Sequence, residues 1–135
     1  MKTSDPKFYV ASRSSLRDRM HMWRAFRAAG NSVTSTWIDA DVHNDQSDAW
    51  HAEMWEKIGV EVAACDALIF YAELDDFPMK GALVEIGMAL ALKKRVLAVL
   101  PGVTLEPKTY RPVGSWVCHP LVSVVTSLEE AMKLC

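Results

Sequence analysis

The chain has 135 residues, 50% of them hydrophobic, and its 15 lysines and arginines against 17 aspartates and glutamates give a net charge of −2. This length fits one domain over residues 1–135 with a substantial core, and the apolar fraction is too high for a disordered chain. No apolar run approaches the ~20 residues that a membrane span needs, the start lacks the apolar core of a signal peptide, and the charge argues against binding a nucleic acid polymer.

Short β-like runs alternate along the chain with longer helical ones. The first run, Phe8–Ala11, is apolar without alternation, which is typical of a strand covered on both faces. Four more strands are predicted, over residues 32–38, 67–71, 95–100 and 121–125. Apolar residues at helical spacing predict helices over residues 16–29, 49–64, 79–93 and 126–134, and the intervening stretches 39–48, 73–78 and 101–120 are expected to be loops.

Continuous apolar strands separated by helices indicate a parallel sheet with helices on both faces. For five strands in a chain of this length we expect an α/β flavodoxin-like (Rossmann-like) three-layer sandwich with strand order 2-1-3-4-5. Sheets of this kind bind ligands at the carboxyl ends of the strands, beside the switch point between the first and third strands. Residues that directly follow Phe8–Ala11 and residues 67–71 are therefore candidates for a binding site.

Glu85 is the only ionisable residue between Gly81 and Leu92, within a predicted helix that is apolar on nearly every face. An unpaired buried carboxylate is costly, so we interpret Glu85 as functional rather than as part of a narrow solvent-facing stripe. It lies within about two turns of the helix start, where the helix dipole would help keep it ionised. Such a carboxylate could act as nucleophile, base or hydroxyl ligand, and the small Gly81 would let a ligand approach the backbone.

The segment after the first strand, Ser12-Arg13-Ser14-Ser15, leads into a predicted helix N-terminus, where free N–H groups attract anions. Three hydroxyls and a guanidinium make it a candidate phosphate site, although serine is also an ordinary helix cap. The charges are uneven: residues 1–30 carry a net +5, residues 31–85 a net −10 and residues 86–135 a net +3. These blocks are either solvated faces or groups that converge on one cleft after folding.

Aromatic and acidic residues surround the same predicted cleft. Tyr9 is either a core aromatic or a hydroxyl donor to Glu85 across the adjacent strand. Trp37 either stacks on a base or packs in the core, and three carboxylates, Asp39, Asp75 and Asp76, would ring the cleft. The tryptophans of the predicted helices are expected in the core or at a subunit interface, namely Trp23, Trp50 and Trp55.

Cysteine and histidine usage predicts no metal site. Cys65, Cys118 and Cys135 have unrelated spacings and the four histidines are scattered, so no ligand cluster is expected. A reduced, cytoplasmic protein without a cofactor is the simplest interpretation, with Cys65 as a small core residue at a helix end.

Four segments resemble the nucleoside 2-deoxyribosyltransferase superfamily, which includes the deoxynucleoside 5′-monophosphate N-glycosidases: residues 9–12, 30–38, 65–69 and 81–91. The likeness extends over residues 7–132, and the Glu85-Ile86-Gly87-Met88-Ala89 segment is its most specific part. It implies an enzyme that cleaves the N-glycosidic bond of a nucleoside or its 5′-monophosphate, without a metal, and releases the base or transfers the sugar. The resemblance assigns Glu85 as the nucleophile of a covalent glycosyl ester and Tyr9 as the residue that orients it.

Three positions depart from the pattern of the family. Ile58 stands where an Asp is usual, so Glu61, Glu56 or a loop Asp would have to replace it. Met79 stands where the transferases have Asp and the hydrolases Ser. Ser115 aligns with a late-loop residue that a neighbouring subunit donates, which implies a homo-oligomer and, together with the Ser/Arg segment, favours a monophosphate substrate.

Two alternatives to an N-glycosidase remain open at this stage. Ile58 and Met79 are compatible with a catalytically degenerate module that only binds nucleotides. The tryptophan-rich helices would also suit a structural or interaction protein.

Overall fold

The computed structural model describes residues 5–40 and 46–135, and its centre is a five-stranded sheet in which every neighbouring pair is parallel. The strand order is β2-β1-β3-β4-β5, which confirms the predicted flavodoxin-like α/β sandwich. The strands are β1 (Lys7–Ala11), β2 (Ser32–Val33), β3 (Ala67–Tyr71), β4 (Arg95–Val99) and β5 (Val122–Val125).

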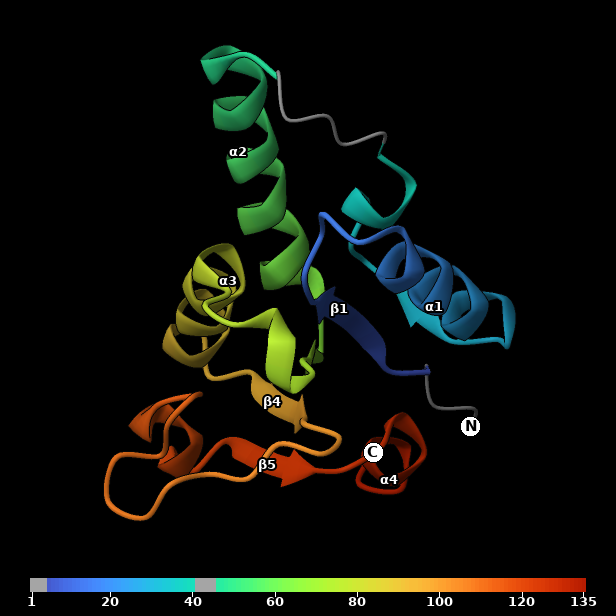
Figure 1. Cartoon of the computed structure of the whole chain (residues 1–135). Helices are drawn as coiled ribbons and strands as arrows, with labels where there is room; N and C mark the ends of the chain where they lie inside the picture. The colour runs from blue at the N-terminus through green and yellow to red at the C-terminus, as the bar shows by residue number, and fades with distance from the viewer. Residues whose placement is uncertain (1–4, 41–45) are drawn as a thin grey trace.

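Helices cover both faces of this sheet (Figure 1). Helices α2 (Asp48–Ala64) and α3 (Lys80–Ala91) lie together on one face, and α1 (Arg17–Ala28) and α4 (Leu128–Met132) lie on the other. None of the helices in the described part of the chain is long and apolar enough to cross a membrane.

The middle strands are buried on both faces, as their continuous apolar sequences predict. Their register places Tyr9 beside Leu68 and Ala11 beside Phe70, so β1 and β3 end at the same edge of the sheet. Cys65 is buried at the end of α2, as predicted. The loops after β1 and β3 consequently meet at the switch point.

The predicted strand over residues 32–38 is wrong beyond Val33, because side chains replace the backbone pairing that a longer strand would make. The register would bring Ser35 opposite Val10. Instead the Val10 amide donates to the Ser35 hydroxyl at 2.7 Å, and the Trp37 indole donates to the Val10 carbonyl at 2.8 Å. The chain can therefore leave the sheet early and turn into the short 3-10 helix η1 (Trp37–Asp39).

The predicted loops contain short helical turns. The 73–78 stretch includes η2 (Leu74–Asp76), and the 101–120 stretch includes η3 (Ser115–Cys118). Part of the predicted loop 39–48, residues 41–45 with Asp41, Asn44 and Asp45, lies outside the described residues. Ser127 caps α4 by accepting a hydrogen bond from the Glu130 amide.

Candidate active site

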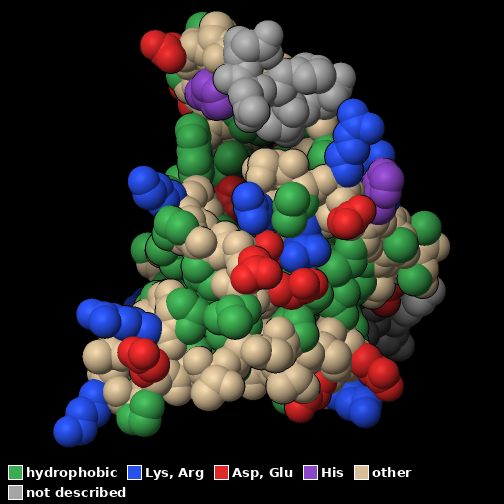
Figure 2. Space-filling model, viewed as in Figure 1, with side chains coloured by type: hydrophobic (Ala, Val, Ile, Leu, Met, Phe, Trp, Pro, Cys, Tyr) green, Lys and Arg blue, Asp and Glu red, His purple; other side chains and the backbone are tan. Residues whose placement is uncertain are grey.

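A cavity of about 330 Å³ opens at the carboxyl ends of β1 and β3. Its walls come from the β1–α1 loop, η1, α2, the end of η2 and the start of α3. Figure 2 shows this face of the molecule, with basic and acidic side chains close together in its hollowed centre below the tip of α2. The cavity therefore lies at the switch point where the sequence places a binding site.

Glu85 contributes a buried carboxylate to this cavity. It lies on α3, is only 9% exposed, and is in the cavity lining. The fully buried Tyr9 of β1 donates its hydroxyl to Glu85 Oε1 at 3.0 Å. The structure thus brings together the two residues that the sequence pairs across the sheet.

Burial is the largest influence on Glu85 and raises its pKa to about 7, against an ordinary value of 4.5. The hydrogen bond from Tyr9 lowers this pKa, while the negative charge of Glu61 raises it. The pKa of Tyr9 is itself raised, by burial and by the nearby Glu85 charge, so Tyr9 stays protonated and acts as a donor. The raised pKa is opposite to the expectation that the helix start would keep Glu85 ionised, because desolvation outweighs the hydrogen bond that favours the charged form.

A second wall of the cavity, formed by the β1–α1 loop and the start of α3, carries hydroxyl and cationic groups. Ser14, Ser15 and Arg13 line it from the β1–α1 loop, and Lys80 lines it from the first turn of α3. Neither α1 nor α3 has a side-chain hydrogen bond at its N-cap. Two uncapped helix N-termini beside two cations make this wall suited to an anion.

Ser12 and Trp37 are in the cavity lining but their polar atoms already have protein partners. The buried Ser12 hydroxyl accepts a hydrogen bond from the Trp23 indole at 2.8 Å. The Trp37 indole N–H is bound to the Val10 carbonyl, so only its ring is available to a ligand. Trp23 belongs to the core, as predicted.

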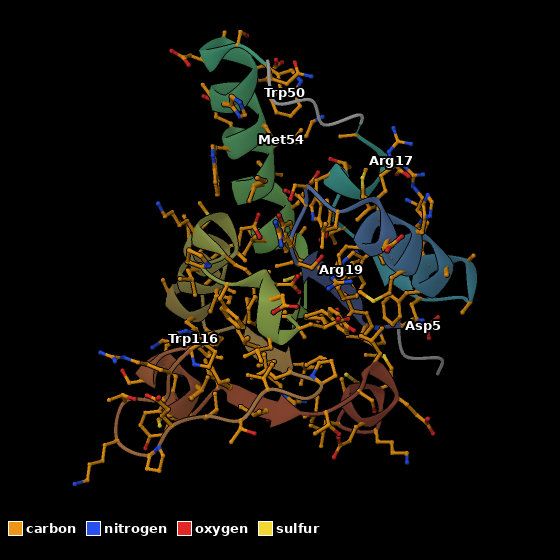
Figure 3. The ribbon with its side chains drawn as sticks, viewed as in Figure 1. Asp5, Arg17, Arg19, Trp50, Met54 and Trp116 are labelled. Carbon is orange, nitrogen blue, oxygen red and sulfur yellow. The ribbon has the colours of Figure 1, made fainter. Side chains whose placement is uncertain are left out.

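The predicted ring of loop carboxylates is present only in part. Asp76 lines the cavity, but its carboxylate lies 2.9 Å from Arg19, which reaches across from α1 (Figure 3), and also accepts from the Glu73 amide. Asp75 is not part of the lining and contributes its carbonyl to Arg13 at 3.3 Å. Asp39 pairs with Arg27 at 2.7 Å on the surface and lies outside the cavity.

The aromatic wall on α2 was missed by the sequence analysis, which placed Trp50 and Trp55 in the core or at an interface. Both are half-buried and line the cavity together with Met54 and Ile58. Positions 50, 54 and 58 are spaced by four residues and therefore share one helix face. That pattern alone does not separate a ligand wall from a core face. The spacing is the only signal in the sequence, because the distance by which α2 extends past α3 is a tertiary feature.

Two of the three positions that depart from the family pattern lie in the cavity, where Ile58 and Met79 are each 6% exposed. Glu61 does not replace the missing Asp, because its carboxylate accepts from the Thr36 amide at 3.1 Å and from the Thr36 hydroxyl at 2.6 Å. Glu56 is exposed and outside the lining. Gly81 lines the cavity, and Trp55 covers it, 3.9 Å from where a Cβ would stand.

Ser115 begins η3 and is exposed, away from the cavity of its own chain. In the described part of the chain, no group of three His, Cys, Asp or Glu side chains is arranged to hold a metal ion. The groups that the cavity offers to chemistry are thus the Glu85 carboxylate with its tyrosine donor, the exposed imidazole of His51 and a wall suited to an anion, whereas the Asp76 carboxylate is held by Arg19.

No protein-family model matches the chain, and no curated protein matches its sequence. Solved structures match its fold. A CMP N-glycosidase from Clostridium botulinum gives a TM-score of 0.56 at 16% identity, over 95% of each chain. A 2-deoxyribosyltransferase from Bacillus psychrosaccharolyticus gives 0.60 at 19% identity, over 74% of this chain and 77% of that one. A 2-deoxyribosyltransferase from Leishmania mexicana gives 0.59 at 21% identity, over 96% of this chain and 95% of that one. The chain thus has the fold that the resemblance in its sequence implies.

Proposed function

We propose that the chain is a single-domain member of the nucleoside 2-deoxyribosyltransferase superfamily that cleaves the N-glycosidic bond of a nucleoside 5′-monophosphate or nucleoside. One observation carries the proposal: Glu85 is buried in the cavity at the switch point and receives the Tyr9 hydroxyl at 3.0 Å. A desolvated, oriented carboxylate is what attack on an anomeric carbon requires.

In the proposed reaction, Glu85 attacks C1′ of the sugar as C1′ takes on oxocarbenium character. The C1′–N bond breaks, its electron pair leaves with the base, and the base nitrogen takes a proton from solvent. Water then adds to C1′ and cleaves the ester, releasing the sugar and a proton and restoring the carboxylate. A second base in place of water would give transfer instead of hydrolysis.

The test is a screen for free base, using nucleosides and their 5′-monophosphates, each with and without a second base. Release at multiple turnovers supports an N-glycosidase, and exchange that requires the second base supports a transferase. Ile58 and Met79, which make the cavity apolar beside Glu85, favour a second candidate, a module that binds nucleotides without turnover. Thermal stabilisation by nucleotides with no base release over hours would select this candidate.

Replacing Tyr9 with phenylalanine is expected to reduce the rate of base release about tenfold or more near pH 7. Loss of the hydroxyl removes an interaction that lowers the Glu85 pKa, so less of Glu85 is ionised. In the wild type the rate should rise with pH through about 7, and in the variant this rise should move to higher pH. The measurement is kcat against pH.

Tyr71→Phe is the matched control for Tyr9→Phe, since the Tyr71 hydroxyl donates to Glu73 just before η2 and Tyr71 is outside the cavity lining. Its pH profile should follow the wild type. If the rise of kcat with pH occurs at the same pH in Tyr9→Phe as in the wild type, Tyr9 does not have the proposed role.

Replacing Lys80 with alanine is expected to raise KM for a 5′-monophosphate about tenfold and to leave KM for the parent nucleoside unchanged. Lys80 lies in the cavity beside the uncapped start of α3, so it would contact the phosphate. The KM values of both substrates measure this difference. Lys57→Ala removes an exposed lysine of α2 outside the lining and is the control. Equal losses for both substrates would contradict phosphate binding by Lys80.

We also propose that the chain forms a homo-oligomer through the outer face of α3. Leu83, Val84 and Leu92 are 39%, 51% and 49% exposed, and Val60 of the neighbouring α2 is 71% exposed. A helix that is apolar on nearly all sides is normally covered, and the chain itself covers only the inner side of α3. A neighbouring subunit could also bring its Ser115 towards the cavity, as the resemblance implies.

Val84→Lys is therefore expected to give a monomer where the wild type is a dimer or larger assembly. Light scattering at micromolar concentration measures the mass of each. Leu134→Lys, which changes an exposed leucine next to α4 on the other side of the sheet, should leave the assembly intact. A wild type that is monomeric at this concentration contradicts the proposal.

A further inference from the structure

Helix α2 projects beyond the edge of the sheet (Figure 1). The Trp55 ring lies over Gly81, which aligns Trp55 with the first turn of α3. Helix α3 begins at Lys80, whereas α2 begins at Asp48, so α2 extends past the start of α3 by about six residues, or ~9 Å at the rise of an α-helix. The first two turns of α2 consequently form a wall above the cavity rather than a layer on the sheet.

The inner face of this wall is mainly aromatic and apolar, and it also carries the exposed imidazole of His51. Trp50 and Met54 lie on the projecting turns (Figure 3), and Trp55 continues the same face towards Gly81. All three are half-buried although they line an open cavity. By contrast, Glu53, Glu56 and Lys57 of the same helix are exposed and outside the lining. A half-exposed indole on a projecting helix leaves apolar area that a planar ligand could cover.

The charges of the cavity determine which end of a ligand reaches this wall. The lysine and arginine of the lining, Lys80 and Arg13, come from the start of α3 and the β1–α1 loop, whereas α2 contributes one basic side chain, the imidazole of His51. An anionic group therefore belongs at the loop and the α3 start, and the sugar carbon belongs at Glu85. The remaining part of a nucleotide, its base, then lies against α2.

We propose that the face formed by Trp50, Met54 and Trp55 binds the nucleobase by stacking, and that the enzyme consequently ranks bases by ring area more than by their hydrogen-bonding edges. The proposal rests on the proposed function for the sugar and anionic ends, and deepens it by assigning the third part of the substrate. Stacking is tolerant of base identity because every base has a π-face, and purines offer the larger one.

The test measures affinity by calorimetry in the Glu85→Gln background, so that no ligand is consumed. The probes are deoxyadenosine 5′-monophosphate, deoxycytidine 5′-monophosphate and, as a ligand without a base, deoxyribose 5-phosphate. The purine nucleotide should bind more tightly than the pyrimidine nucleotide. Trp50→Ala should weaken the purine nucleotide about ten- to a hundredfold and leave deoxyribose 5-phosphate unchanged, while Trp50→Phe should keep most of the affinity.

Met54→Ala is a second variant on the same face and should give a smaller loss of the same kind. Met132→Ala is the control, because Met132 is half-buried on α4, on the other face of the sheet (Figure 1) and outside the cavity, and its loss should not change nucleotide affinity. The proposal is overturned if Trp50→Ala binds the purine nucleotide like its parent, or if it loses as much affinity for deoxyribose 5-phosphate.

Failure of the proposed function would look different from failure of the base wall. If the wild type releases no base but binds nucleotides in a way that depends on Trp50, the proposed base-binding face is supported and the proposed N-glycosidase activity is contradicted. If substitutions of Trp50 and Met54 leave base release unchanged for purines and pyrimidines alike, the proposed activity is supported and the proposed base-binding face is contradicted.

Discussion

Replacing Glu85 with glutamine is expected to reduce base release by a factor on the order of ten thousand or more, because the variant has no nucleophile to form the glycosyl ester. Glutamine keeps the volume of the side chain and can still accept the hydrogen bond that Tyr9 donates to Oε1. Nucleotide binding should therefore persist while chemistry stops. The measurement is single-turnover release of free base, with calorimetry to show that the substrate still binds.

Glu56→Gln is the matched control, since it makes the same chemical change at an exposed position of α2 outside the cavity. It should retain the wild-type rate. A Glu85→Gln protein that releases base at the wild-type rate would show that the nucleophile is another group. Mass spectrometry of wild-type protein quenched during turnover provides a second check, because the sugar should be attached to the peptide that contains Glu85.

The same substitution is expected to stabilise the fold, and to do so increasingly as the pH rises. Burial raises the pKa of Glu85 from 4.5 to about 7, so between these values the folded chain holds a proton that the unfolded chain has lost. The stability of the wild type consequently falls with rising pH over this range. Above about pH 7 the accumulated cost is about 3 kcal/mol, and glutamine, which does not titrate, avoids it.

Urea unfolding of both proteins at about pH 4, pH 6 and pH 8 measures this difference. Glu85→Gln should match the wild type at the lowest pH and exceed it by up to about 3 kcal/mol at the highest. Glu56→Gln should show no such trend, because Glu56 is exposed. A gain in stability that is independent of pH would indicate a packing effect rather than release of a buried charge. A gain with the expected trend would mean that the chain gives up stability to keep a carboxylate in its cavity.

Most of the fold could be predicted because hydrophobic pattern and topology agree along the chain. Strand β3 occupies the predicted residues 67–71, and α2 begins within one residue of its predicted start. The strand over residues 32–38 could not be bounded in the same way. Its β-branched composition suits a strand, but the Ser35 and Trp37 side chains bind the backbone of β1 in place of the ladder. Hydrogen bonds of this kind, from side chains to the backbone of another strand, are not reflected in the local β-propensity from which the strand is predicted.

A site residue could be predicted where its polarity differs from that of its neighbours in the sequence. Glu85 stands alone among apolar neighbours, which is why a single carboxylate could be chosen and why it is found in the cavity. Asp39 could not be judged in this way, because an acidic residue after a strand suits a surface ion pair, here with Arg27, as well as a cleft. Trp50 was misplaced for a related reason. The sequence specifies the helix face on which it lies, but not that α2 projects past α3.

The early end of β2 has a further consequence for the behaviour of the protein in solution. An exposed sheet edge with unpaired amides and carbonyls is a template on which another chain can add a strand and aggregate. Beside β2, the amide and the carbonyl of Val10 are occupied by Ser35 and Trp37, and β2 itself has only two residues. The Ser35 and Trp37 side chains, of which Trp37 also lines the cavity, thereby protect this margin of the sheet from edge-to-edge association.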